Sequence, residues 1–526
     1  MNGLLHTMGG RANSGVDRPR HSRRRALLAL SQVVAGSITI GLSGCAVSLP
    51  PLPFRPTPVP TRITVVVGDA YTHVQGNPRD PQQYSSLQLV ADGAIQRWTK
   101  AAEATLQGKV ALTVRVADML HSTFWQEVTL NTVSGSGSDT EQPLYLASHA
   151  MLRRLQAGGI LADLRPLLDR EHRLRGQLSA DALTSMQWAG AQAGLPVALW
   201  PQLAATDARL PAPPAAWTWA DAAAIPAGAG NWPVQLFPLA PTLEAWLWPQ
   251  QADLLTADGT KTLIDQPAGI AAAGAYAQAF GPPPALSPVP GGVAAANLGS
   301  LIPAQGQVFN AWAAQALQRR DQQIQQRQVS VWFPTEEWPP ASPAPHPWQD
   351  GVGPLRRLAP PGAAATGVPI IAYGLGIRAD AAQPELLWHA AQALQAATPG
   401  YLAYSPFTAD QTAEGLRKRW SHLAADQATV LASILKLRLR PVWGVPTAWP
   451  QGQFAAPADV LTPAYWQRRI SAVDSGTAQD FSRILTELIG TLSLVLGLGL
   501  LPPAQAAANA AQALLALMPL MQVRPS

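Results

Sequence analysis

A β-branched run, a helical pattern and a second β-branched run constrain the fold of this chain more than any other feature. The first run, Arg62–Gly68 (RITVVVG), has the uninterrupted apolar character of a strand buried on both faces of a parallel sheet. An amphipathic stretch over roughly Leu87–Leu106 predicts a helix, and Val110–Val116 predicts the next strand. Strand, helix and strand in this order predict a βαβ unit and an α/β fold.

The alternation continues beyond this unit. Ser134–Asp139 (SGSGSD) predicts a flexible loop, Pro143–Leu146 a third short strand, and His149–Ala157 a helix that stops at Gly158-Gly159. The 526 residues exceed one ordinary domain, so we expect two or more lobes. Only 13% of residues are charged, but large apolar residues occur throughout, which predicts a globular body and not disorder.

The N-terminal 44 residues have the pattern of an export signal. Arg23-Arg24-Arg25 precedes an uncharged apolar stretch, Ala26–Gly44. The paired arginines resemble a twin-arginine signal, and a Sec leader with a basic front is the alternative. This segment holds six of the 37 basic residues and one of the 32 acidic ones, so it carries the formal +5 and leaves 31 of each sign in the rest. The pI of about 9.5 therefore does not indicate a nucleic-acid partner.

Leu42-Ser43-Gly44-Cys45 resembles a bacterial lipobox, and Cys45 is the only cysteine. The resemblance implies cleavage before Cys45 and conversion of its thiol to a diacylglyceryl thioether. Each buried CH₂ contributes about 0.8 kcal/mol, so two acyl chains would hold the protein on the outer face of the cell membrane. The alternative is an uncleaved signal anchor, although the apolar stretch barely reaches spanning length. The six prolines of residues 46–60 predict a semi-rigid tether, and a lone cysteine excludes disulfides within the chain.

Three later segments share a recognisable order. They are Gly159–Leu168 (GILADLRPLL), Gly190–Pro196 (GAQAGLP) and Pro213–Asp221 (PPAAWTWAD). This order resembles the extracellular solute-binding lipoproteins of ABC importers, family 1, the maltose-binding-protein-like, carbohydrate-associated group. Further matches are Asp258–Asp265 with the helical stretch Pro267–Phe280 after it, and Leu358–Gly362, Gly374–Ala379 and Pro384–Ala391. The resemblance covers roughly residues 61–395.

The sequence also departs from the family pattern. The family's "G-x-A-A-M" segment is absent, and Gln328–Pro334 stands at its place. The Pro-rich stretches 281–290 and 338–347 have the composition of insertions. These departures concern the pocket more than the fold.

The resemblance implies an α/β, two-lobed periplasmic-binding-protein-like fold (type II) with a cleft between the lobes. The expected organisation is a signal peptide (1–44), a lipidated Cys45 with its tether (45–60), lobe 1 from 61–197, lobe 2 from 207–364, and a remainder (377–526) shared by both lobes and ending in helices. Crossings near 198–206 and 365–376 would join the lobes. The family captures a solute, most often a carbohydrate, and passes it to an ABC permease without changing a bond.

Tryptophan is the informative residue type, with 18 copies against 8 Tyr and 9 Phe. An indole face stacks on sugar rings while its N–H serves a polar partner. Core packing is the more frequent role of any single Trp. We select candidate ligand contacts by their position relative to the expected crossings and strand ends. The candidates are Trp200, Trp332, Tyr373, Trp246, Asp69 and Tyr71, and Trp248 is a further candidate beside Trp246.

Motifs for other chemistry are missing from the sequence. The nine histidines form no metal-ligand pattern, and neither a G-x-S-x-G elbow nor a phosphate-binding loop occurs, so we expect no metal, no cofactor and no enzyme. Asp69, Asp139 and Glu244 could form a glycosidase carboxylate pair. A surface glycan hydrolase and a scaffold lipoprotein with a degenerate cleft remain alternatives, as do peptide and polyamine ligands.

The C-terminal stretch Leu488–Gln522 contains no charged residue. A membrane span would need roughly twenty apolar residues, and Pro502-Pro503 divides the stretch into two shorter parts. We therefore expect two packed helices there.

Overall fold

The structure is a computed structural model in which the chain divides into two compact units, Met1–Thr57 and Pro58–Ser526. All described residues belong to the second unit. They are 60–67, 94–116, 142–207, 212–224, 232–235, 240–257, 259–280, 329–332, 355–397, 404–420, 423–443, 464, 485, 488–489, 491–492, 495–496 and 501–521. The expected signal peptide, Cys45, most of the tether, the loop 134–139 and both Pro-rich insertions lie outside the described residues.

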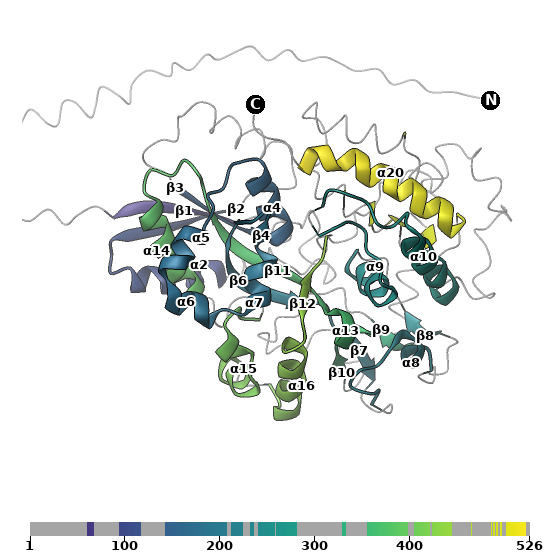
Figure 1. Ribbon diagram of the computed structural model, residues 1–526. Coiled ribbons are helices and arrows are strands. Elements are labelled where there is room, and N and C mark those ends of the chain that lie inside the picture. Colours follow the sequence, from purple (N-terminus) through teal and green to yellow (C-terminus); the bar gives the residue numbers. More distant parts are fainter. Residues whose placement is uncertain are drawn as a thin grey trace, which may run out of the picture. The chain divides into compact units, whose positions relative to one another are not determined.

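The larger sheet has six strands, drawn from both halves of the chain (Figure 1). Its strand order is β12-β11-β3-β1-β2, and β6 pairs with β11 in addition. β1 runs parallel to both β2 and β3, while β11 runs antiparallel to β3 and to β6. The strands are β1 (Thr61–Val67), β2 (Val110–Val116), β3 (Gln142–Ser148), β6 (Leu195–Pro201), β11 (Val368–Ile377) and β12 (Leu439–Pro441).

The βαβ unit predicted from the sequence is confirmed. β1 begins one residue before the predicted run and ends one residue before Gly68, and β2 has the predicted bounds. The helix between them, α2 (Ala94–Thr105), occupies the C-terminal part of the predicted amphipathic stretch. Ile63 through Val67 are all buried, as expected for a strand covered on both faces.

β11 is the central strand of this sheet, and all ten of its residues are buried. Along one edge it pairs with β12 over residues 368–370 and with β3 over residues 373–377. Along the other edge it pairs with β6 over residues 370–375. Strands from four distant parts of the sequence therefore meet through the backbone of one strand.

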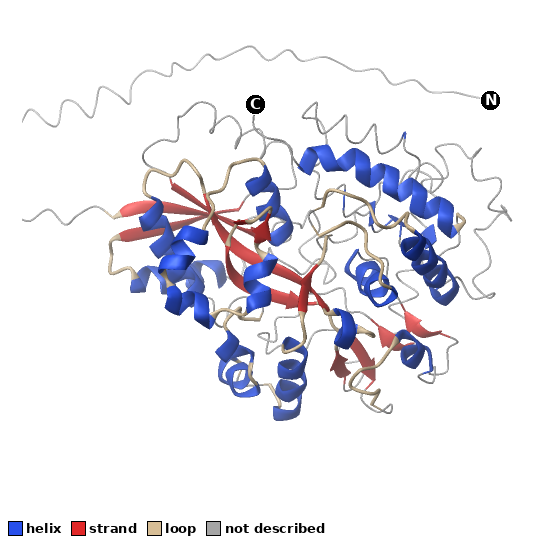
Figure 2. Ribbon diagram, in the orientation of Figure 1, coloured by secondary structure: helices blue, strands red, loops and turns tan. Residues whose placement is uncertain are grey.

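Helices cover both faces of the sheet (Figure 2). On one face lie α2 and α14 (Pro384–Ala397), where the indole N–H of Trp98 donates to the carbonyl of Leu394 at 2.8 Å. The other face is covered by α4 (His149–Ala157), α7 (Ala180–Ser185), α15 (Ala413–Arg419) and α16 (Ala425–Leu435). Shorter helices α5 (Arg165–Arg170), α6 (His172–Gln177) and η6 (Thr408–Gln411) complete this part.

Helix α4 has the bounds predicted from the sequence. The hydroxyl of Ser148 caps its N-terminus by accepting from the N–H of Met151 at 3.4 Å, and Gly159, with φ of 70°, allows the chain to leave it. Its apolar face rests on two glycines of β11. A Cβ at Gly374 or at Gly376 would lie 3.1 Å from the side chain of Leu152 on α4, and one at Gly374 would also lie 2.8 Å from the sulfur of Met186, which follows α7.

A second core is formed mainly by helices. It contains α8 (Trp219–Ala224), α9 (Ala240–Leu247), α10 (Pro267–Phe280) and α20 (Pro503–Met521), and the short η3 (Trp248–Gln250) follows α9. α10 has the predicted bounds. α8 begins with a capping box inside the Pro213–Asp221 motif, since Thr218 Oγ1 accepts from the N–H of Asp221 at 3.2 Å and Asp221 Oδ2 accepts from the N–H of Thr218 at 2.7 Å.

A four-stranded sheet of order β10-β7-β9-β8 accompanies this core. The chain leaves the large sheet after Pro201 and enters the small one at Ala204, and it returns through α13 (Ala363–Thr366) into β11. Within the stretch Gln328–Pro334, residues Val329–Trp332 form a strand of this sheet. The strands are β7 (Ala204–Asp207), β8 (Trp232–Gln235), β9 (Val329–Trp332) and β10 (Leu355–Leu358).

The described residues of the uncharged C-terminal stretch pack within the second core. α20 starts at Pro503, in the first turn where proline fits, and packs against α10. The described helical residues between 485 and 496 are buried in the same core. Among the helices of the described part, none is long and apolar enough to cross a bilayer.

The contact between α4 and β11 predicts a strong effect of Gly374→Ala. The new Cβ would lie 3.0 Å from the carbonyl oxygen of Leu195, which belongs to the paired strand and cannot move aside cheaply. We expect the free energy of unfolding in urea to fall by about 1–3 kcal/mol. Gly274→Ala, in the interior of α10 with nothing within 4 Å of the new Cβ, is the control and should raise it by up to about 1 kcal/mol. Equal effects of the two changes would contradict this account.

Candidate functional site

Trp200 and Tyr373, two of the candidates expected from the sequence, lie side by side in the large sheet. Their rings meet edge to face at 4.6 Å, and the two side chains are 5% and 0% exposed. They come from the paired strands β6 and β11 and belong to the core beneath α14. As ligand contacts both stay predictions, and their packing in the structure is that of core residues.

The other candidates are distributed over the molecule. Trp246 lies in the second core, where its ring packs near Trp219 and Tyr276 and its indole N–H donates to the carbonyl of Ala272 at 3.0 Å. Trp332 is the last residue of β9. Asp69, Tyr71 and Asp139 lie outside the described residues. The structure therefore brings Trp200 and Tyr373 together and places Trp246 in another core.

Two tryptophans that the sequence did not single out differ from the rest. Among the tryptophans whose side chains the structure describes, only Trp188 and Trp443 are more than marginally exposed. Their rings meet edge to face at 6.3 Å, and the guanidinium carbon of Arg153 lies 5.8 Å from the centre of each ring. We call these three side chains the Arg153 cluster. Its aromatic faces are partly open, which buried core tryptophans cannot offer to a ligand.

Trp188 is held by a tight hairpin. β4 (Gln187–Trp188) and β5 (Ala191–Gln192) are joined by Ala189 and Gly190, whose φ angles of 46° and 82° match a type I′ turn. Glycine adopts this conformation freely, whereas Ala189 is strained there. Such strain persists only where the surroundings fix the turn.

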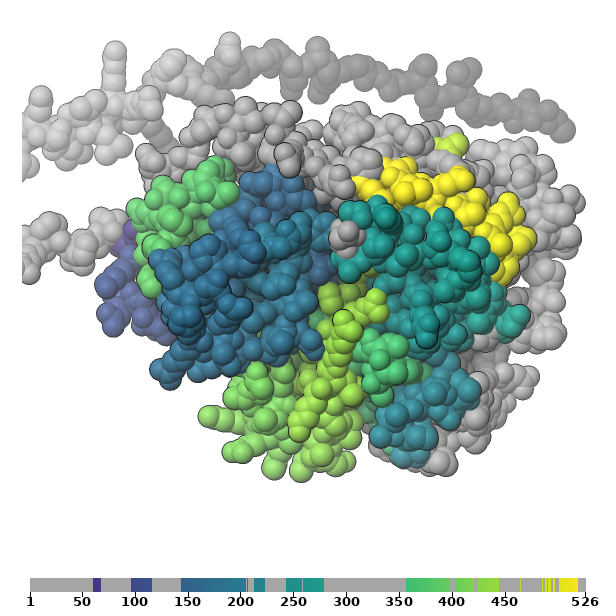
Figure 3. Space-filling model, in the orientation of Figure 1, coloured from purple at the N-terminus to yellow at the C-terminus, as the bar shows by residue number. Residues whose placement is uncertain are grey.

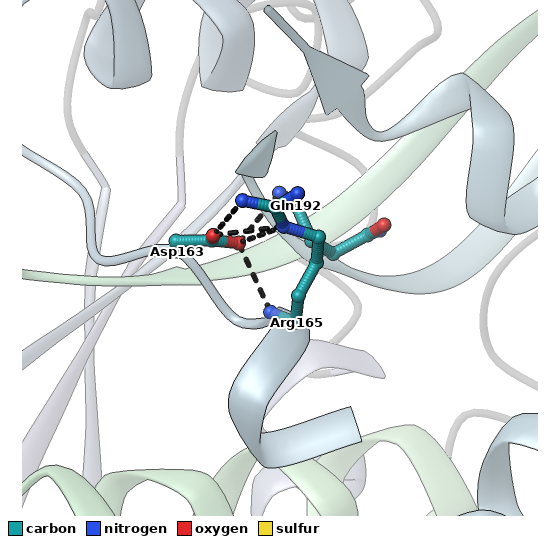
Figure 4. Close-up of polar contacts among 3 residues, drawn as sticks. All are labelled: Asp163, Arg165 and Gln192. Carbon is teal, nitrogen blue, oxygen red and sulfur yellow. Dashed lines mark hydrogen bonds and ion pairs between the residues drawn. The ribbon is translucent and has the colours of Figure 1, made fainter. Parts of the chain in front are cut away.

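Asp163 fixes this hairpin to the start of α5 (Figure 4). One carboxylate oxygen accepts from the N–H of Gln192 at 2.9 Å, and the other accepts from the guanidinium of Arg165 at 2.6 Å. Partial burial raises the pKa of Asp163, but the hydrogen bonds from Arg165 and Gln192 outweigh burial and hold that pKa below its ordinary value. The aspartate of the GILADLRPLL motif therefore has a positioning role here.

Trp443 is held from both sides through its backbone. Its N–H donates to Oε1 of Glu244 on α9 at 2.8 Å. The carbonyl of the preceding residue, Val442, accepts from Nε2 of His149 at 2.7 Å, and Nδ1 of His149 accepts from the N–H of Ala372 at 3.2 Å. Because Nδ1 is an acceptor, the imidazole carries its proton on Nε2.

His149 also completes the large sheet. Ala372 lies between the stretch of β11 that pairs with β12 and the stretch that pairs with β3. Neither β12 nor β3 pairs with Ala372, and Nδ1 of the His149 imidazole accepts the hydrogen bond from the Ala372 N–H. Burial, aided by the charge of Arg153 one helical turn away, lowers the pKa of His149 to about 3, so the ring is neutral at pH 7.

The segment 439–443 links the two cores, because Val442 belongs to the core of the large sheet and Trp443 packs against the second core. In Figure 3 the yellow-green part of the chain lies between the blue and the teal parts. Arg440 forms an ion pair with Asp253, which follows α9 and η3, and its guanidinium lies over the ring of Trp248 at 4.1 Å. Burial raises the pKa of Asp253, although Arg440 acts in the opposite direction. The N–H of Leu439 donates to Asp181 of α7 at 2.6 Å. Trp443 is thus the last residue of a segment anchored on both the large sheet and the second core.

Arg153 has an unusual electrostatic position. Burial lowers the pKa of its guanidinium to about 10. Among the described residues no carboxylate forms an ion pair with it, and its shielded Nε has no hydrogen-bond partner. The two indole rings are its contacts, and each cation–π contact contributes about 0.5–1 kcal/mol or more when water is excluded.

Glu244, one of the carboxylates considered for glycosidase chemistry, is buried and accepts the N–H of Trp443. Within the described ranges no group of three or more His, Cys, Asp or Glu residues could hold a metal ion. The described chain therefore presents an aromatic and cationic site, with carboxylates in supporting positions.

No family model matches the sequence, and no curated protein matches it either. Solved structures do match. One is the ABC substrate-binding protein Lmo0181 from Listeria monocytogenes in complex with cycloalternan, with a TM-score of 0.50, 13% identity, and coverage of 86% of this chain and 98% of that chain. Another, from Synechococcus sp. MITs9220, is described as a "putative oligosaccharide periplasmic-binding protein", with a TM-score of 0.51, 14% identity and the same coverage.

These likenesses concern the fold. The fold class predicted from the sequence, α/β of the two-lobed periplasmic-binding-protein type, is confirmed. Both neighbours are binding proteins of the kind that the sequence motifs resemble.

The buried His149 predicts a pH-dependent stability. Its pKa is about 3 in the folded protein and about 6.5 in the unfolded chain, so between these values the unfolded chain binds one more proton. This contribution is complete above pH 6.5 and is lost as the pH falls toward 3, by up to about 1.4 kcal/mol per pH unit. We expect His149→Gln to have a shallower pH dependence of urea unfolding between pH 6 and 4. The exposed His389→Gln, on α14, should keep the wild-type slope; an unchanged slope in His149→Gln would contradict the assignment.

Proposed function

We propose that this protein is a lipid-anchored solute-binding protein that captures a saccharide for an ABC importer. Its fold is that of two proteins whose described ligands or roles concern oligosaccharides, and the likeness extends over 98% of each of them. Fold alone does not define a ligand. The observation that carries the proposal is the pair of partly exposed indoles, Trp188 and Trp443, on this scaffold.

The proposed lobes are 61–197 and 207–364, with 377–526 shared between them. The passage of the chain from β6 of the large sheet to β7 of the small one supports a crossing near 198–206. Its return from β10 to β11 supports the second crossing near 365–376. Trp188 and Trp443 pack against the second core while Arg153 belongs to α4 on the large sheet, which favours a ligand position where the lobes meet.

The proposed mechanism is capture by differential affinity. A saccharide that contacts both lobes stabilises the closed form over the open form, and only the free-energy difference between these two bound forms drives closure. The closed form would then be recognised by a permease. In this proposal no bond is made or broken, and no cofactor takes part.

Catalysis is the less supported alternative. A glycosidase needs two carboxylates flanking the scissile bond, separated by roughly 5–10 Å. Glu244 is buried and engaged with the backbone of Trp443, which supports a positioning role for it. The neighbours of similar fold are binding proteins, which supports binding without turnover.

The proposed location is the outer face of the cell membrane. The basic and apolar order of residues 1–44 supports export, and Cys45 at the end of Leu-Ser-Gly supports lipidation. The proline-rich residues 46–60 would hold the binding body a short distance from the bilayer.

Trp188→Ala tests the binding site. Loss of one stacking ring should weaken saccharide binding about tenfold, which corresponds to about 1.4 kcal/mol. The measurement is isothermal titration of the purified full-length protein in detergent with neutral and acidic di- and trisaccharides. Trp200→Phe, in the core beside Tyr373, serves as the control and should leave the affinity unchanged. If Trp200→Phe weakens binding and Trp188→Ala does not, the ligand lies at the candidates expected from the sequence.

Cys45→Ala tests the anchor. Cells supplied with a clickable fatty acid should label the wild-type protein and not the variant, because the thioether needs the Cys45 thiol. The wild-type protein should partition with the membrane fraction after a carbonate wash. Labelling that persists in Cys45→Ala would rule out this lipidation site.

A further inference from the structure

We propose that the saccharide carries an anionic group, a carboxylate, sulfate or phosphate, that pairs with Arg153. This inference rests on the proposed saccharide-binding function and narrows its ligand class. It arises from a cation for which the described part of the chain supplies no counter-charge.

The first step concerns the state of the guanidinium. Arg153 lies on the same face of α4 as His149, one helical turn further along. Its guanidinium carbon lies 5.8 Å from the ring centre of Trp188 and 5.8 Å from that of Trp443. Other arginines of the large-sheet half have acidic partners, such as Arg165 with Asp163, Arg170 with Glu385 and Arg378 with Asp380. Arg153 has ring contacts in place of such a partner.

The second step concerns the energetics. A partly dehydrated guanidinium without a carboxylate loses solvation that cation–π contacts replace only in part. The same loss of solvation on burial lowers the pKa of the Arg153 guanidinium, because burial disfavours its charged form. An incoming anion would remove this penalty, since arginine donates to carboxylate, sulfate or phosphate through two parallel N–H bonds.

The third step concerns what surrounds the charge. Trp188 and Trp443 are the partly exposed indoles of the described chain and border the guanidinium directly. Within the described residues their indole N–H groups have no hydrogen-bond acceptor, so they are free to donate to a ligand. A ring that stacks on an indole and carries a negative substituent satisfies both parts of the cluster. Uronic acids and sulfated or phosphorylated sugars have this combination.

The charge state of the neighbouring His149 is consistent with a negatively charged ligand. His149 is neutral, so it adds no second cation to the cluster, and Glu244 is engaged with the N–H of Trp443. The carboxylates assigned to this region are therefore occupied in holding the backbone. Within the described residues no carboxylate is left to pair with Arg153, and the negative charge of a ligand is the complement that we propose.

The test compares charged and neutral sugars of matched shape by isothermal titration with the full-length protein in detergent. The pairs are digalacturonate against digalactose, and glucose 6-sulfate and glucose 6-phosphate against glucose. We expect at least one charged member to bind tenfold or more tighter than its neutral partner. That preference should shrink as salt rises from 20 to 500 mM, roughly the range over which a partly exposed ion pair becomes screened. The three charged probes distinguish the carboxylate, sulfate and phosphate sources.

Arg153→Gln should abolish the preference, because it should weaken binding of the charged sugar about tenfold more than binding of the neutral sugar, which corresponds to about 1.4 kcal/mol. Arg153→Lys keeps the charge without the fork and should retain part of the preference. Arg170→Gln, which removes an exposed ion-paired charge from α5, is the matched control and should retain all of it. If Arg153→Gln does not fold, the preference of the wild-type protein and its salt dependence still decide the matter.

Two results would overturn the inference in different ways. Equal binding of charged and neutral sugars, or equal weakening of both by Arg153→Gln, would assign Arg153 to packing alone and leave saccharide binding standing. Failure of every sugar, charged or neutral, to bind would overturn the proposed function and this inference together.

Discussion

The structure depends on one strand, β11, whose backbone joins strands made far apart in the sequence. It exchanges hydrogen bonds with β3 and β12 on one edge and with β6 on the other, and its ten residues are all buried. A buried backbone N–H without a partner is costly, so the gap between β3 and β12 must be filled. His149 fills it by accepting from Ala372. The same imidazole then donates to Val442, so the repair of the sheet also positions Trp443.

The candidate site follows from this arrangement. Trp443 is placed by His149 and Glu244, and Trp188 by the hairpin that Asp163 holds through Gln192. Arg153 occupies the helix face that His149 begins, one turn away. The backbone that carries each of the three side chains is therefore held by hydrogen bonds or by a helix, which limits the conformational entropy that a ligand would have to remove.

Much of the fold was predictable because its signals are local. β1 and β2 are uninterrupted β-branched runs, and α4 has a serine cap and a Gly-Gly stop, so their bounds agree with the structure to within a residue. β11 was not recognised as a strand, because Gly374 and Gly376 weaken its propensity. Those glycines are needed where Leu152 and Met186 approach the strand, a requirement that only the tertiary structure reveals.

The site was harder to predict for the same reason. Arg153, Trp188 and Trp443 belong to three segments without a shared motif, and only the fold brings them together. The frequency of tryptophan pointed to aromatic recognition, but it could not tell the two partly exposed rings from those in the cores. The available signal was the spacing of His149 and Arg153, four residues apart on one helix, where two polar residues share a face.

The bond between His149 and Val442 spans 293 positions. During synthesis the early strands β1, β2 and β3 emerge long before β11, and the last partner of His149 emerges only after β12. A nascent chain that ends before β12 and residue 442 would leave one edge of the sheet unpaired and the His149 Nε2–H without the acceptor that Val442 provides. Such high contact order slows folding and leaves the chain unfinished for longer. The final closure of the sheet is thereby delayed until most of the polypeptide has been made.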